Sequence, residues 1–223
     1  MKELAMKTVN LSKTYHMGNN KIEALKETNL EIEQGSFVAL TGTSGSGKST
    51  LLHLLGGLDA PTTGEVWIGG QSLSKCKEKQ LAEIRRDRIG FVFQKFHLIQ
   101  ELNVRENIIM PILLASKKVN EAYIEDLCDV LGLGERMEHM PHELSGGQQQ
   151  RTAIARALAN EAEVLLCDEP TGNLDKKTSE EVLSLLHDIH EKYKKTILIV
   201  THDMEIAESA DYMLRIEDGC ILD

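Results

Sequence analysis

Short, continuous apolar segments alternate along this chain with polar and glycine-rich ones. Three of them, at residues 36–41, 164–167 and 196–200, are almost entirely apolar, and residues 89–93 form a fourth. Strands of this composition are typical of a parallel sheet that helices cover on both faces, because neither face then meets water. The apolar pattern therefore predicts an α/β core.

The N-terminal third of the chain has a different pattern. Residues 4–11 and 23–33 read as strands, with a period of two over residues 30–33, and residues 64–70 read as a short strand bounded by turns. Alternation of this kind indicates strands with one buried face, as in antiparallel sheets. This region therefore predicts an antiparallel β layer beside the start of the parallel core.

Residues 94–158 change to a helical pattern. Helices are expected at residues 104–110 and 120–131, and a further helix opens at Ser145. The buried-strand pattern then returns at residues 164–167. The helical stretch is therefore an insertion between two parts of the core.

A glycine-rich loop follows the apolar run at residues 36–41 and leads into a helix at residues 48–55. It fits the pattern G-x-x-x-x-G-K-[ST], whose backbone amides surround nucleotide phosphates, with Lys48 reaching the β- and γ-phosphates and Ser49 binding Mg²⁺. An ordinary glycine-rich turn is the plainer alternative. The pattern predicts ATP or GTP binding by Gly42, Thr43, Ser44, Gly45, Ser46, Gly47, Lys48, Ser49 and Thr50.

This loop makes the expected fold an α/β fold with a P-loop NTPase (RecA-like) core, an N-terminal antiparallel β subdomain and an inserted α-helical subdomain. We expect a single domain over residues 1–223. Residues 1–93 and 159–223 would form the nucleotide-binding core with its β subdomain, and residues 94–158 the helical subdomain.

Two carboxylates follow the apolar run at residues 164–167. Asp168 would end a buried strand, where a carboxylate holds Mg²⁺ through a water molecule. Neighbouring strand residues point to opposite sides, so Glu169 is the better candidate for the general base that polarises the attacking water. A solvated Asp-Glu turn is the alternative, which the preceding strand and the upstream glycine loop disfavour.

A second glycine motif reads Leu144-Ser145-Gly146-Gly147-Gln148. Ser145 is expected to cap a helix, and the two glycines allow an anion to approach the helix end closely. The motif resembles the signature of ATP-binding cassette (ABC) ATPases, whose site closes only when two subunits meet. Similar matches, in the family's order, occur at Phe93-Gln94, Gly172-Asn173-Leu174-Asp175 and Thr201-His202-Asp203, so the resemblance covers nearly the whole chain.

The resemblance implies roles for single residues. Gln94 would sense Mg²⁺ and the γ-phosphate, and His202 would donate a hydrogen bond to the γ-phosphate. Asp175 would belong to a loop that crosses to the other subunit. The signature residues Ser145, Gly146, Gly147 and Gln148 would meet the nucleotide held by the opposite subunit. Tyr15 would stack on adenine, although a tyrosine that only packs is the alternative.

Several stretches resemble the MacB/LolD/FtsE-like branch of ABC proteins, among them residues 54–64, 91–99 and 170–175. This implies an ATP-dependent homodimer that drives a separate membrane permease and exports or releases a peptide, a macrolide or a lipoprotein. Phe96 would lie in the groove that receives the permease, unless it only packs the helical insertion. The alternative function is a soluble ABC ATPase with a regulatory role, in cell division or on nucleic acid.

Net charge limits the classes of binding partner, and cysteine usage indicates the cellular compartment. Lys and Arg number 25 against 35 Asp and Glu, and this net charge of −10 disfavours nucleic acid as a partner. Residues 1–7 lack the apolar region of a signal peptide. No apolar stretch reaches the roughly 20 residues that a membrane span needs. The four cysteines are scattered along the chain, which suits reduced thiols. We expect a cytoplasmic protein held on the inner face of the membrane by the permease.

Overall fold

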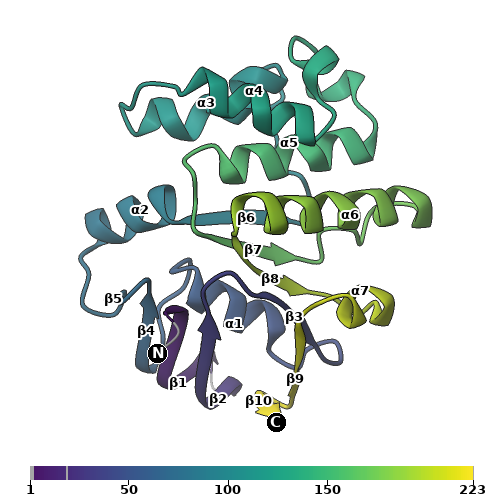
Figure 1. Ribbon diagram of the computed structural model, residues 1–223. Helices are drawn as coiled ribbons and strands as arrows, with labels where there is room; N and C mark the ends of the chain where they lie inside the picture. Colours follow the sequence, from purple (N-terminus) through teal and green to yellow (C-terminus); the bar gives the residue numbers. More distant parts are fainter. Residues whose placement is uncertain (1–2, 19, 223) are drawn as a thin grey trace. The chain divides into compact units, whose positions relative to one another are not determined.

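The computed structural model describes residues 3–18 and 20–222 and consists of two compact units (Figure 1). One unit comprises residues 1–85 and 196–223, and the other comprises residues 86–195. Met1 and Lys2, part of the segment examined above for a signal peptide, lie outside the described residues. None of the helices in the described part of the chain combines the length and apolarity that a membrane span requires.

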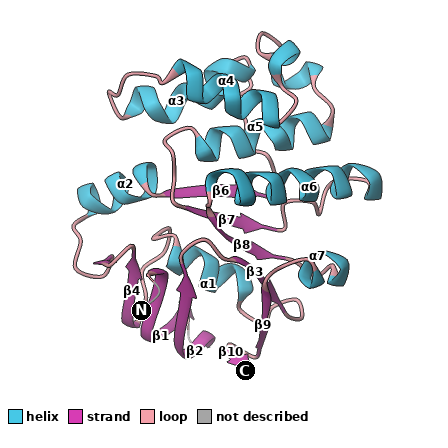
Figure 2. Cartoon of the chain, in the orientation of Figure 1, coloured by secondary structure: helices cyan, strands magenta, loops and turns pink. Residues whose placement is uncertain are grey.

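An antiparallel sheet forms one layer of the first unit (Figure 2). It contains β1 (Leu4–Met17), β2 (Asn20–Glu33), β4 (Thr63–Ile68) and β5 (Gln71–Ser72), in the order β2-β1-β4-β5. This confirms the predicted antiparallel layer. The hairpin of β1 and β2 is longer than predicted, because residues 12–16 and 20–24 in its outer part include no fully buried side chain and so carry no apolar alternation.

The first unit also contains four strands of a mainly parallel sheet. Its central strand β3 (Phe37–Thr41) pairs in parallel with β8 (Thr196–Val200) and β9 (Tyr212–Glu217), and β10 (Cys220–Leu222) pairs antiparallel to β9. Every residue of β3 and β8 is buried, which accounts for their continuous apolar sequences. The helices α1 (Lys48–Leu55) and α7 (Met204–Glu208) belong to this unit, as do all but the last two residues of α2 (Glu78–Asp87).

The second unit contains one parallel pair of strands and most of the helices. The strands are β6 (Ile89–Phe93) and β7 (Val164–Asp168). The helices, with the bounds that the structure gives them, are α3 (Val104–Leu114), α4 (Glu121–Val130), α5 (Gly146–Leu158) and α6 (Lys176–Tyr193), with 3-10 turns at Gly134–Arg136 and Pro141–Glu143. The predicted strands and helices here are confirmed, but α3 continues past residue 110 and accommodates Pro111.

Side-chain contacts hold the helices of the second unit together. The Arg151 guanidinium of α5 donates to the Glu181 carboxylate of α6 over 2.6 Å. At the other end of α6, the Asp126 carboxylate of α4 accepts from Lys192 at 2.5 Å and from the Tyr193 hydroxyl at 2.7 Å. The inserted helices are thus tied to α6 at both of its ends.

Candidate nucleotide-binding and catalytic site

The loop between β3 and α1 has the backbone conformation of an anion cradle. Gly45 and Gly47 adopt φ values of 77° and 108°, and a β-carbon on Gly47 would lie 2.4 Å from the Ala24 carbonyl oxygen. Among the described residues, no side chain caps the N-terminus of α1, where Gly47 is the N-cap. The first amides of this helix therefore suit an anionic ligand.

The polar side chains of the loop are arranged around the same place. The Lys48 side chain is buried, and its Nζ donates to the carbonyl oxygens of Gly42 and Thr43, both at 2.8 Å. These neutral acceptors are weaker partners for an ammonium group than a phosphate would be. The buried Ser46 hydroxyl has no hydrogen-bond partner in the described part of the chain, whereas Ser49 is exposed on the first turn of α1.

His202 emerges from the same sheet edge as the loop. It follows β8, which is the parallel neighbour of β3, and the Thr201 amide donates to the Leu40 carbonyl oxygen at 3.2 Å. The carboxyl ends of parallel strands lie at one edge, so His202 and Gly42 leave the sheet on the same side. The imidazole is exposed and can therefore meet a ligand there.

Tyr15 is fixed by a polar network in the first unit. Its hydroxyl donates to Asp59 Oδ2 at 2.8 Å, and Lys13 Nζ donates to Asp59 Oδ1 at 2.7 Å and lies 4.8 Å from the Tyr15 ring centroid. Burial opposes ionisation of Asp59, but the hydrogen bonds from Lys13 and Tyr15 outweigh it and lower its pKa. Burial raises the pKa of the Tyr15 hydroxyl, and the nearby Thr50 side chain of α1 partly offsets this rise, so the ring lies close to the helix that follows the phosphate loop.

The carboxyl edge of β6 and β7 brings three predicted residues together in the second unit. Phe93 pairs with Asp168 across the two strands, so Gln94 and Glu169 both leave the same edge. Glu169 adopts a left-handed φ of 47°, which costs a residue with a β-carbon roughly 1–2 kcal/mol. Such strain is typical of functional positions. The edge therefore carries the Gln94 amide and the carboxylates of Asp168 and Glu169.

Cys167 precedes these carboxylates and stays neutral. It is fully buried, and this burial, together with the nearby Asp168 charge, raises the pKa of its thiol far above the usual range. Cys167 is therefore a small buried apolar residue. All four cysteines carry free thiols, in agreement with the sequence-based expectation.

The second glycine motif forms the N-terminus of α5. Ser145 is the N-cap, as predicted: its Oγ accepts from the Gln148 amide at 3.3 Å, and the Gln148 side chain accepts from the Ser145 amide at 2.9 Å. A β-carbon on Gly146 would meet Leu174 at 3.3 Å and Phe96 at 3.7 Å. The glycines thus allow close packing by neighbouring segments.

Asp175 caps α6 next to this motif. Its carboxylate accepts from the Thr178 hydroxyl at 2.6 Å and from the Thr178 amide at 3.1 Å, and these hydrogen bonds lower its pKa. Asp59, Asn173 and Thr178, which orient other candidate residues, were not identified from the sequence as site residues. Asp59 and Thr178 belong to no chemical motif, and Asn173 lies within the Gly172-Asn173-Leu174-Asp175 match without a role of its own. Asp59 and Asn173 contact residues far away in the chain.

Comparison with known proteins places the chain in a family. The sequence profile described as "ABC transporter" matches residues 25–172. The chain is 44% identical over 218 residues to the lipoprotein-releasing system ATP-binding protein LolD of Saccharophagus degradans, covering 97% of this chain and 96% of that protein. It is 46% identical over 215 residues to the macrolide export ATP-binding/permease protein MacB of Bartonella quintana, but spans only 32% of that protein and 96% of its own length.

A solved structure of an ABC cassette has the same fold as this chain. The dimeric ATP-binding cassette MJ0796, in a post-hydrolysis state bound to ADP and Pi, aligns with a TM-score of 0.88 and 42% identity. The alignment covers 98% of this chain and 97% of MJ0796. A phosphate loop, a strand ending in two carboxylates and a serine-capped glycine motif therefore occur together on an ABC cassette fold, and the chain belongs to the ABC transporter family as one of its ATPases.

Proposed function

We propose that this chain is the ATP-driven subunit of a transporter of the MacB/LolD type. The observation that carries the proposal is the presence, in one chain, of a complete phosphate loop and of a glycine motif at a second helix N-terminus. The first suits the chain's own nucleotide. The second suits the γ-phosphate of a nucleotide that another copy holds, because a helix N-terminus attracts anions.

Each side chain has a defined part in ATP hydrolysis. Lys48 neutralises the β- and γ-phosphates, Glu169 polarises the attacking water, and His202 donates to the γ-phosphate as it is transferred. The Ser49 hydroxyl, the Gln94 amide oxygen and the Asp168 carboxylate are all hard oxygen donors, which suit Mg²⁺. When bound, Mg²⁺ supplies charge stabilisation to the phosphates.

ATP binding would assemble a homodimer with two nucleotides at its interface. In support, MJ0796 is dimeric with ADP and Pi bound. Ser145, Gly146 and Gly147 of one copy would complete the site opened by residues 42–49 of the other, and Asp175 would belong to the loop that crosses between them. Tyr15 would stack on the adenine ring, because its hydroxyl is anchored beside α1 and the face of the ring is the natural partner of a base.

The dimer would act on a permease. MacB is named as an ATP-binding/permease protein, and this chain matches 32% of its length. LolD, which the chain spans almost completely, is named as an ATP-binding protein of a lipoprotein-releasing system. We infer a separate permease that moves a macrolide, a peptide or a lipoprotein, contacts the chain near Phe96 and holds it on the inner face of the membrane.

The Glu169→Gln variant tests the proposal. Loss of the general base should slow hydrolysis by about 10²- to 10⁴-fold and trap an ATP-bound dimer, measured by light scattering in saturating Mg-ATP. The matched control is Glu163→Gln, which makes the same change just before the amino end of β7 and should hydrolyse ATP at the wild-type rate. A Glu169→Gln protein that stays monomeric would contradict the shared site.

A further inference from the structure

Gln94 is held by the loop that leads into α6. Its Nε2 donates to Asn173 Oδ1 at 3.2 Å, and Asn173 Nδ2 donates to the backbone carbonyl oxygen of Gln94 at 3.0 Å. The two residues lie 79 positions apart, yet each contacts the other through a donor and an acceptor. One residue therefore controls both the position and the rotation of the Gln94 amide.

The donor and acceptor roles of these two side chains follow from one group that can only accept. A backbone carbonyl can only accept, so the Asn173 amide must turn its nitrogen toward Gln94. Its oxygen then faces the Gln94 side chain and can only accept in turn. Gln94 must therefore present Nε2 to Asn173. Its other amide atom, the acceptor Oε1, then points away from Asn173.

Gly172 keeps the Gln94 side chain in this arrangement. A β-carbon on Gly172 would lie 2.7 Å from Gln94 Nε2, 3.1 Å from its Cδ and 3.3 Å from its Cγ. The glutamine side chain thus lies along the α-carbon of Gly172, in space that only glycine leaves open. Packing and hydrogen bonding together favour one rotamer and one orientation of the amide.

We propose that Asn173 is a positioning residue that presents the Gln94 Oε1 oxygen to Mg²⁺. Mg²⁺ prefers oxygen to nitrogen, and an amide rotated by 180° would offer an NH₂ group that cannot bind a cation. Partners that orient a metal ligand commonly matter almost as much as the ligand itself. The proposal rests on the Mg²⁺ role of Gln94 under the proposed function.

The experiment removes both hydrogen bonds with a side chain of similar size, Asn173→Leu. ATP affinity is measured by calorimetry in the Glu169→Gln background, with Mg²⁺ and with EDTA in its place. We expect affinity with Mg²⁺ to fall about 10-fold, while affinity in EDTA stays within about twofold. In a Gln94→Ala background, the same substitution should change neither value, because no amide remains to be oriented.

Two controls separate orientation from general damage. Asn120→Ala removes the N-cap of α4 in the same unit and should lower thermal stability without changing the ratio of the two affinities. In the nucleotide-free protein, thermal unfolding of Asn173→Leu, Gln94→Ala and the double variant should show non-additive losses, since the two side chains interact directly.

Failure of the proposal for Asn173 can be distinguished from failure of the proposed function. An equal loss of affinity with Mg²⁺ and in EDTA, or the same loss in the Gln94→Ala background, would overturn the proposal for Asn173 and leave the Gln94 role intact. Additive losses of stability would overturn it as well. If Gln94→Ala alone leaves the Mg²⁺ dependence of ATP affinity unchanged, the assignment of Gln94 under the proposed function is wrong, and the proposal for Asn173 falls with it.

Discussion

The Thr178 methyl group occupies the space beside the α-carbon of Gly147, where a β-carbon would lie only 2.4 Å away. The Thr178 hydroxyl donates at the same time to the Asp175 carboxylate over 2.6 Å. One side chain on the first turn of α6 therefore contacts both the glycine motif of α5 and the residue that caps α6. The requirement for glycine at position 147 comes from this packing as well as from any ligand.

The first prediction tests this contact. Gly147→Ala should lower the free energy of unfolding by about 1–3 kcal/mol, because the added methyl group has no space. Thr178→Ser removes the clashing methyl group and keeps the hydroxyl for Asp175, so the double variant should recover much of the loss in urea denaturation. A double variant as unstable as Gly147→Ala would show that the clash is relieved in another way.

The second prediction separates nucleotide binding from hydrolysis. Lys48→Ala removes a charge that faces the phosphates and should weaken ATP binding about 10-fold or more. His202→Ala should keep the affinity within about threefold and lower kcat about 10²-fold or more, because its contact strengthens during phosphoryl transfer. Calorimetry and phosphate release measure the two effects. Equal losses of affinity in both variants would contradict these roles.

The third prediction concerns pH and the Tyr15 network. The pKa of Asp59 is lowered in the folded state, so its charge stabilises the protein above the ordinary value of 3.8, and this stabilisation is lost as the pH falls below that value. Asp59→Asn should therefore be less stable than wild type at pH 7, by about 0.5–1 kcal/mol for a partly exposed group.

Urea denaturation between pH 7 and pH 3 measures this difference, which should shrink once the pH falls below 3.8. Tyr15→Phe is the matched control, because it removes the hydroxyl and keeps both Asp59 and Lys13. A difference between Asp59→Asn and wild type that stays constant down to the lowest pH would show that the charge of Asp59 contributes nothing.

The fourth prediction concerns coupling to the permease. Phe96 is half-buried near Gly146, and the carbonyl oxygens of Phe96 and His97 accept from Arg156 at 2.9 and 2.6 Å. The backbone is thus held independently of the Phe96 ring. We expect Phe96→Ala to keep basal ATPase activity within about twofold while losing stimulation by the permease, because aromatic anchors dominate such contacts.

Basal and permease-stimulated phosphate release, together with thermal unfolding, measure the outcome for Phe96→Ala. The nearby control is Lys95→Ala, which truncates an exposed side chain next to Gln94 and should leave both activities unchanged. A collapse of thermal stability would assign Phe96 to packing of the helical insertion, and normal stimulation would remove it from the contact with the permease.

Local sequence determined the bounds of those strands and helices whose residues share one environment from end to end. Strands β6 and β8 and helix α1 have the predicted bounds, because a buried strand needs a continuous apolar run and the phosphate loop specifies the helix that follows it. Ser145 was identified as an N-cap for the same kind of reason, since a cap depends on residues three positions apart.

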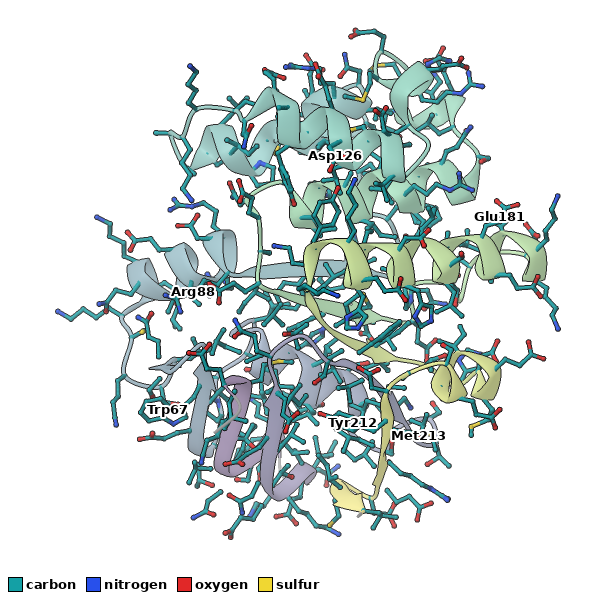
Figure 3. All side chains as sticks on the ribbon, in the orientation of Figure 1. Trp67, Arg88, Asp126, Glu181, Tyr212 and Met213 are labelled. Atoms are coloured by element: carbon teal, nitrogen blue, oxygen red, sulfur yellow. The ribbon has the colours of Figure 1, made fainter. Side chains whose placement is uncertain are left out.

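Strands β9 and β10 were missed because no apolar run marks them: β9 is a strand through its pairing with β3, and β10 through its pairing with β9. Tyr212 and Met213, the first two residues of β9 (labelled in Figure 3), are both exposed. Their side chains give no periodic signal, and backbone hydrogen bonds to a distant strand decide their conformation.

The contacts that orient the candidate site residues were decided only by the tertiary structure. Asn173 meets Gln94 across 79 positions, and Asp59 meets Tyr15 across 44. Local sequence restricts the backbone of each segment, but it contains no information about which distant side chain will lie beside it. The motifs therefore identified the residues that are proposed to touch the nucleotide. The tertiary structure selected the residues that hold them in place, because a hydrogen bond between distant segments exists only after folding has brought the two segments together.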